Sequence, residues 1–343
     1  MTPTNGSVRV SNESQSHDFS PPEIAFWFTM YGVVTLLAVF GNAFVIVSVL
    51  LNAKMRNVQN YFIVNLAVAD MTAGLLAVPF RFQAALLQRW TLPHFMCNVL
   101  TFIDPFSMSI SVLTLTVSAI DRYFVVFVAQ RSKMTRSHAV KLIATIWVFS
   151  TICSAPFGIL HRTQLISMKH TNSAVWQCLP IYQESPYWHT YNIYLTIVQY
   201  FIPVIIVDTI YIVIAAKITF TDNAGTSVAT SVRKRQSARF QKDRRRIIKL
   251  LMVVVTVFTF CWLPYEIYLV LSEVYPQINE VYYISIIFMA SHCLGMSNSC
   301  INPFIYGIFN IRFRRSYKRT MSVLCCRRPE QPSVLNSVAI FVG

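Results

Sequence analysis

The chain alternates between long apolar stretches and short polar ones. Seven stretches contain enough consecutive apolar residues, about 20, to cross a bilayer as a helix. They lie at about 24–51, 58–86, 96–128, 139–161, 187–218, 247–272 and 279–308. The alternating pattern of a membrane β-barrel is missing, and no internal repeat of the transporter kind is visible. The pattern predicts an all-α membrane protein, a bundle of seven transmembrane helices.

Composition and charge indicate the orientation of this bundle. Only 13% of the 343 residues are charged, against about 25% in soluble proteins. Of the 29 Lys and Arg, 24 lie within or beside the segments that follow the first, third, fifth and seventh spans. Cytoplasmic loops are enriched in these residues, so the N-terminus is predicted outside. The net charge of +15 then reflects this bias and attraction to anionic membrane lipid, and nucleic-acid binding is not expected.

Both ends of the chain carry candidate modification sites. The N-terminal tail contains two glycosylation sequons, at Asn5 and Asn12. Beyond the last span, residues 310–322 mix cations with apolar residues, which is typical of a helix lying in the membrane interface. Cys325 and Cys326 follow it as candidate palmitoylation sites, or as plain cytosolic thiols. Four segments are therefore predicted: an extracellular glycosylated tail at 1–23, the bundle at 24–308, an amphipathic helix at 309–324 and a cytoplasmic tail at 325–343.

The predicted topology places only two cysteines in an oxidising compartment. Cys97 lies at the outer end of the third span, and Cys178 lies in the segment that joins the fourth and fifth spans. One disulfide between them is the expected pairing, and two free thiols are the alternative.

Ionisable and amide side chains inside the spans are candidates for function because burying them in a bilayer is costly. Asp70 lies in the middle of the second span, and other spans offer oxygen-bearing side chains at similar depth. These are Asn42, Ser111, Asn298, Ser299 and Asn302. A lone carboxylate among hydroxyl and amide oxygens suits a small hard cation or a water cluster. A hydrogen-bonded polar core without an ion is the alternative.

With one motif in each span, residues 24–326 resemble the rhodopsin-like (class A) G-protein-coupled receptors. The motifs are Gly41-Asn42, Leu66 to Asp70, Cys97 with Asp121-Arg122-Tyr123, Trp147, Pro203 with Tyr211, Cys261-Trp262-Leu263-Pro264, and Asn302-Pro303-Phe304-Ile305-Tyr306. Any single motif arises by chance, but their order and spacing together leave little room for it.

This resemblance implies a receptor of the plasma membrane whose cytoplasmic end binds a heterotrimeric G protein, and later arrestin and receptor kinases. Asp121 is expected to hold Arg122 at rest, and Tyr123 completes that motif. In the active state, Arg122, Tyr211 and Tyr306 are expected to face the G protein. Trp262 and Pro264 would be the ligand-sensing switch and the hinge. The family's allosteric sodium site maps onto Asp70, Ser111, Asn298 and Asn302.

The ligand is predicted from the outer halves of the spans. Asp104 lies 18 residues before Arg122, which is five turns of about 3.6 residues, so it faces the bundle interior. Asp104 either contacts the ligand or pairs with Arg81 or His292. Asp104 and Glu266 together favour a cationic ligand group. Further candidate contacts are Arg81, Gln199, Tyr265, Phe288 and His292, with Trp176 and Glu184 in the segment after the fourth span.

The seventh span, residues 291–306, resembles that of the neuropeptide Y, neuropeptide FF and tachykinin receptors, which favours a neuropeptide with a basic group. The alternative is a biogenic-amine receptor that uses Asp104 as the ammonium counter-ion. Leu195, Gln199 and Met296 replace residues that amine receptors use, and an opsin is excluded because the seventh span has no lysine.

No catalytic motif of a hydrolase, kinase or metalloenzyme is present in the sequence. The protein is therefore not expected to be an enzyme. An intramembrane protease or a seven-span channel remains a competing class.

Overall fold

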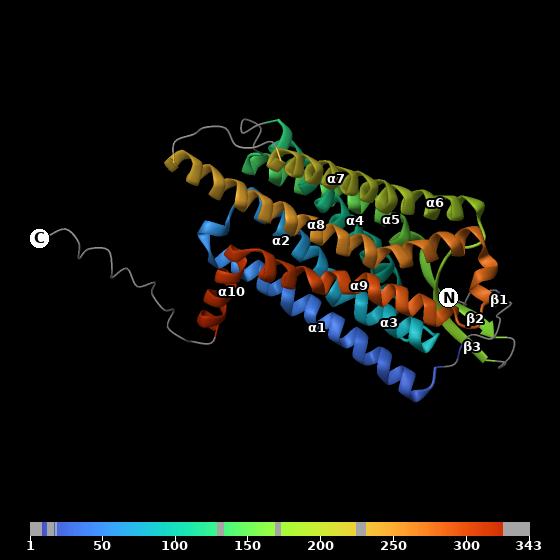
Figure 1. The fold of residues 1–343 in the computed structure, drawn as a ribbon. Coiled ribbons are helices and arrows are strands. Elements are labelled where there is room, and N and C mark those ends of the chain that lie inside the picture. The colour runs from blue at the N-terminus through green and yellow to red at the C-terminus, as the bar shows by residue number, and fades with distance from the viewer. Residues whose placement is uncertain are drawn as a thin grey trace, which may run out of the picture.

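The computed structural model describes residues 9–11, 17, 19–128, 134–168, 173–223 and 231–324. Within these residues, seven helical spans are long and apolar enough to cross a membrane. They pack side by side as one elongated bundle, with the β-strands at one end and α10 at the other (Figure 1). The predicted fold class, an all-α bundle of seven transmembrane helices, is confirmed.

The spans follow one another in chain order, and two of them are each built from two helices joined by a π-helical turn. They are α1 (Pro21–Leu51), α2 (Val58–Thr72) with α3 (Val78–Leu87), α4 (His94–Phe127), α5 (Arg136–Leu160), α6 (Pro186–Thr196) with α7 (Ile202–Asn223), α8 (Ser231–Val274) and α9 (Ile284–Phe309). A short 3₁₀ turn, Ala53–Met55, connects α1 to α2.

The π-helical turns, Ala73–Ala77 and Ile197–Phe201, each end two residues before a proline, Pro79 or Pro203. Proline lacks an N–H and its ring collides with the carbonyl four residues earlier, and a widened turn accommodates both. The extra residue in the turn also changes which side chains face inward. Gln199, inside the second turn, is only 5% exposed for this reason.

The segment between α5 and α6 forms a hairpin of β2 (His161–Met168) and β3 (Ser173–Pro180), which the hydrophobic pattern did not predict. The predicted disulfide is present, because Cys178 of β3 is bonded to Cys97 in the first turn of α4. It holds the hairpin against the end of the bundle. A third strand, β1 (Arg9–Ser11), pairs in parallel with β2.

Three helix boundaries differ from the prediction by five residues or more, and one of them is the end of α7, which lies at Asn223 and not near 218. The helix α8 begins at Ser231, well before the predicted start of the span near 247. Its early residues are rich in Arg, Lys and Gln, which are unfavourable in a bilayer but favour a helix in water. The helix α9 begins at Ile284 and not near 279, because Pro276–Glu280 forms a separate 3₁₀ turn.

The predicted amphipathic helix is α10 (Ile311–Leu324). Asn310 caps it, because its Oδ1 accepts from the backbone N–H of Arg312 at 3.0 Å. Phe313 is fully buried, and the Ser316 hydroxyl accepts from Asn52 Nδ2 of the α1 C-cap at 2.6 Å. These contacts fix α10 to the end of α1. The predicted modification sites at Asn5, Asn12, Cys325 and Cys326 lie outside the described residues.

Candidate functional site

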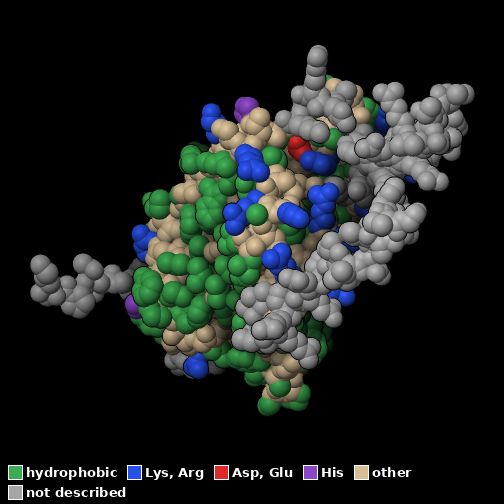
Figure 2. Space-filling model, turned by 90° about the vertical axis from the view of Figure 1, so that its left-hand side faces the viewer, with side chains coloured by type: hydrophobic (Ala, Val, Ile, Leu, Met, Phe, Trp, Pro, Cys, Tyr) green, Lys and Arg blue, Asp and Glu red, His purple; other side chains and the backbone are tan. Residues whose placement is uncertain are grey.

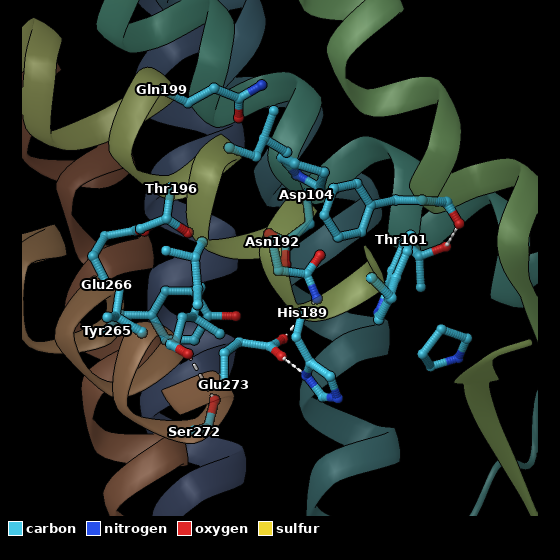
Figure 3. A pocket seen from close by; sticks show the side chains of 18 of the residues that line it. Thr101, Asp104, His189, Asn192, Thr196, Gln199, Tyr265, Glu266, Ser272 and Glu273 are labelled. Carbon is cyan, nitrogen blue, oxygen red and sulfur yellow. Dashed lines mark hydrogen bonds and ion pairs between the residues drawn. The ribbon is translucent and has the colours of Figure 1, made fainter. Parts of the chain in front are cut away.

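A cavity of about 670 Å³ lies between α4, α6 and α8 at the end of the bundle that carries the β2–β3 hairpin (Figure 3). Six of the nine predicted ligand contacts line it. They are Arg81, Asp104, Glu184, Gln199, Tyr265 and Glu266. Glu184 lies in the segment that follows the hairpin. The structure thus brings together residues that are up to 185 positions apart in the chain.

Asp104 is already paired inside this cavity. Its Oδ2 lies 3.2 Å from Nη2 of Arg81, and the Asp104 side chain is 9% exposed. The pair joins α3 to α4 and neutralises the carboxylate that an amine receptor would need free. Asp104 therefore faces the cavity, but it carries its own counter-ion.

Glu266 is the buried carboxylate that has no such partner. It lies one residue beyond Tyr265 on α8, across the cavity from Asp104 (Figure 3), and is 2% exposed. Within the described part of the chain, no Lys, Arg or His lies within ion-pair distance of Glu266. Burying a carboxylate without a cation is costly, so this position favours a ligand that brings a positive charge.

The rim of the cavity holds a polar cluster that was not predicted. Glu273 pairs with His189 and accepts from Asn192 Nδ2 at 2.6 Å, which ties α8 to α6. Glu273 follows Glu266 by seven residues, about two helical turns, so its position on the same face was visible in the sequence. His189 and Asn192 gave no such signal.

His161 at the start of β2 also lines the cavity. Burial lowers its pKa to about 4, although a hydrogen bond with the carbonyl of Phe157 opposes the shift. This imidazole is therefore neutral at pH 7 and adds no positive charge to the cavity.

Three predicted ligand contacts, Trp176, Phe288 and His292, lie outside this cavity. Trp176 is an exposed residue of β3. His292 of α9 is 1% exposed, and its Nδ1 lies 3.0 Å from the Tyr31 hydroxyl. The Tyr265 ring packs against it at 5.4 Å, and Phe288 stacks on it at 5.6 Å. Its position therefore supports neither a direct ligand contact nor the expected pairing with Asp104. Phe288 lines a second, smaller cavity instead.

Two residues of α9, Ser299 and Asn302, bond to the buried carboxylate of Asp70. The carboxylate accepts from Ser299 Oγ at 3.0 Å and from Asn302 Nδ2 at 2.8 Å. Ser111 and Asn298 are 5% and 2% exposed. Four buried amide oxygens have no hydrogen-bond partner in the described part of the chain, and three of them belong to the predicted polar residues of the spans, the Oδ1 atoms of Asn42, Asn298 and Asn302. Unsatisfied oxygens beside a carboxylate fit a hard cation, which takes oxygen ligands.

Trp262, the predicted ligand-sensing switch, lines the cavity itself. Trp262 is 5% exposed and packs so closely on Gly295 that a Cβ there would lie 3.0 Å from its ring. Pro264 lies inside α8 and Pro303 inside α9.

At the far end, Asp121 pairs with Arg122, its neighbour on α4. Tyr211 and Tyr306 are 4% and 2% exposed, and the Tyr211 hydroxyl has no partner among the described residues. Tyr123 is half-buried and stacks on Phe127 at 4.6 Å.

Several known receptors are similar to this chain over most of its length. A tachykinin-like peptides receptor of Drosophila melanogaster is 32% identical over 90% of the chain and 60% of its own length. The human neuromedin-K receptor is 30% identical over 86% of the chain and 61% of its own length. An RYamide receptor of Tribolium castaneum is 31% identical over 88% of the chain and 82% of its own length. The chain thus spans about three-fifths of the first two relatives.

The family model for seven-transmembrane receptors of the rhodopsin family matches residues 41–306. That range runs from Gly41 to Tyr306, the first and last of the predicted family motifs, and includes the whole cavity-lining part of α4 and α8. The chain therefore belongs to the rhodopsin family of seven-transmembrane receptors, multi-pass membrane proteins that are receptors and not enzymes.

Proposed function

We propose that this protein is a G-protein-coupled receptor for an extracellular peptide that carries a cationic group. The observation that carries the proposal is Glu266, a carboxylate that is 2% exposed, faces the cavity and lacks a cation in the described structure. A Lys, Arg or N-terminal amine of a peptide would supply the missing charge. Relatives named as receptors for tachykinin-like peptides, neuromedin K and RYamide support a peptide as the ligand.

The geometry gives less support to a biogenic amine. The carboxylate that would bind its ammonium, Asp104, is occupied by Arg81. Leu195 and Gln199 on the α6–α7 span carry no hydroxyl for a catechol or similar ring. An amine would therefore have to compete with Arg81 for Asp104.

The orientation proposed here places the N-terminus outside the cell and the α10 end in the cytosol. Lys and Arg side chains gather on the α10 end of the bundle (Figure 2). This supports a cytoplasmic position for that end, because cytoplasmic loops are enriched in Lys and Arg. The disulfide-bonded hairpin lies at the opposite end. Asn5 and Asn12 would then be glycosylated in the lumen, and Cys325 and Cys326 would be palmitoylated beside α10.

The cytoplasmic end is proposed to bind a heterotrimeric G protein and, after activation, receptor kinases and arrestin. Its resting state is supported by the Asp121–Arg122 pair and by the buried Tyr211 and Tyr306. Release of Arg122 together with outward movement of α8 would open a basic surface. The same basic side chains would also contact anionic lipid.

A sodium ion is the proposed allosteric ligand of the Asp70 cluster. Asp70, Ser111, Asn298 and Asn302 would hold it. The donor set is all oxygen, and the unpartnered Oδ1 atoms of Asn298 and Asn302 support it. A cation there would stabilise the resting packing of α2 against α9, so it would oppose agonist binding.

Nucleotide exchange on purified G proteins tests the proposed function. The purified receptor is exposed to panels of tachykinin peptides, RYamide peptides and biogenic amines. We expect at least one basic peptide to stimulate exchange, while Arg122→Gln binds the same peptide but loses stimulation. Stimulation by amines alone, with complete loss in Asp104→Asn, would refute the peptide assignment.

A further inference from the structure

A second cavity, of about 280 Å³, lies beside the first one at the same end of the bundle. Its walls come from the end of α3 and the chain that follows it, from α4, from β3 and from Phe288 of α9. Arg81 and Thr101 line both cavities, so they form the partition between them. Nothing in the proposed function above assigns this second cavity a role.

The loop that carries Arg89 is held in place beside this cavity. Gln88 ends α3 with a left-handed backbone, at φ 50°, and its side chain donates to the Ala85 carbonyl at 2.6 Å. The Trp90 N–H donates to the Trp176 carbonyl of β3 at 2.6 Å. The disulfide then anchors β3 itself to α4. Arg89 therefore projects from a fixed turn and not from a loose loop.

The two cavities have opposite charge. The larger one contains four carboxylates, from Asp104, Glu184, Glu266 and Glu273, against a single guanidinium, Arg81. The smaller one is lined by two guanidiniums, Arg81 and Arg89, and by no Asp or Glu. Arg89 is exposed and has no ion pair within the described residues. Arg81 meets Asp104 through Nη2, which leaves further N–H donors on a group that has five.

We propose that the second cavity binds a carboxylate of the same peptide ligand whose cationic group pairs with Glu266. The inference rests on the proposed function, and it defines the ligand class further, as a peptide with both a basic and an acidic group. Arg89 attracts the carboxylate at the entrance, and Arg81 donates to it across the partition. Arg89 has no ion pair among the described residues, so it would favour an anion over a neutral amide, and Arg81 would add a donor beyond its pair with Asp104.

Two synthetic peptide libraries test this inference on the purified full-length receptor. One library holds octapeptides with one Arg and one Glu at varied spacing, and the other has Gln in place of each Glu. Every peptide is made as a C-terminal acid and as an amide, which separates a side-chain carboxylate from a terminal one. Binding is measured as ligand-dependent thermal stabilisation, which reports affinity.

We expect the best Arg–Glu peptides, or the terminal acids, to bind about threefold to tenfold more tightly than their neutral partners. In Arg89→Gln this preference falls below about twofold, and in Arg89→Lys it persists, because the charge is kept. The matched control is Arg162→Gln, which removes an exposed arginine from β2 that lines neither cavity. It should leave the preference unchanged.

Three outcomes overturn the inference. If peptides bind in a Glu266-dependent way but without preference for an acid, the second cavity is not an anion site, while the proposed function stands. If Arg162→Gln abolishes the preference as fully as Arg89→Gln does, general surface charge explains it. If no peptide of either library binds, the proposed function fails, and the anion site fails with it.

Discussion

Replacing Glu266 by Gln tests the charge that the proposed ligand must satisfy. The substitution keeps the size of the side chain but removes its negative charge. Because Glu266 is 2% exposed, its ion pair with a ligand cation would be shielded from water. Removing one partner of a buried ion pair costs about 3–5 kcal/mol, which corresponds to a loss of affinity of roughly 100-fold to 5,000-fold.

The same substitution weakens ligand binding, but it should not destabilise the unliganded receptor. Glu266 has no cation partner in the described structure, so Gln removes a buried charge that nothing compensates. The unliganded variant should melt at the same temperature as the wild type or higher. Asp104→Asn should melt lower, because it leaves the half-buried Arg81 without its partner.

The assay combines thermal melting of the purified receptor with binding of a peptide that contains Arg and of the same peptide with neutral citrulline. If Glu266 meets the Arg, Glu266→Gln and citrulline should each weaken binding, and the two changes together should weaken it little further. Glu280→Gln is the control, because Glu280 is an exposed carboxylate of the turn between α8 and α9 that lines neither of the two cavities. Additive losses, or a lower melting temperature for empty Glu266→Gln, would refute the reasoning.

Three further predictions concern the bundle around this cavity. Asp70→Asn should abolish the effect of sodium on agonist affinity, measured by competition binding in sodium and in choline chloride; an undiminished sodium effect would remove Asp70 from the site. Gly295→Ala places a Cβ 3.0 Å from the Trp262 ring, so it should destabilise the resting state by about 1 kcal/mol and raise basal nucleotide exchange about fivefold. Gly32→Ala is the control, because nothing lies within 4 Å of its Cβ, and it should leave basal exchange unchanged. Because burial holds the pKa of His161 at about 4, below its ordinary 6.5, the folded state binds fewer protons than the unfolded state between these values. Stability should therefore fall by up to about 3 kcal/mol as pH drops from 6.5 to 4, and His161→Gln should flatten this slope in melting curves recorded across that range.

The spans and their order could be predicted because a bilayer imposes a simple rule, about 20 apolar residues per crossing. The disulfide followed from topology, since the predicted orientation left two cysteines outside. The helix ends were harder to predict. The sequence around Ser231 excludes a bilayer but does not exclude a helix, so α8 continues where the hydrophobic pattern stops.

The parts of the site that could not be predicted depend on packing. Asp104 and Arg81 both face the cavity, as predicted, but only the structure decides that they bond to each other. His292 is buried within the bundle, but the Tyr265 and Phe288 rings pack against it and it does not line the ligand cavity. The π-helical turns before Pro79 and Pro203 were not predicted, because a repeat of 3.6 residues does not describe them.

Glu266 lies beside a row of aromatic rings through which ligand binding would change the packing toward the α10 end of the bundle. Its neighbour Tyr265 packs edge-on against Trp262 at 6.1 Å, and Trp262 lies 6.4 Å from Phe258, one turn further along α8. Pro264 interrupts the backbone hydrogen bonds of α8 within this row of rings. A ligand cation that attracts Glu266 would therefore move the part of α8 that follows Pro264. The helix bends most easily there, because the proline removes a backbone hydrogen bond. Among the described residues, Arg122 pairs with Asp121 on its own helix, α4, and no ion pair joins it to a described acid of α8.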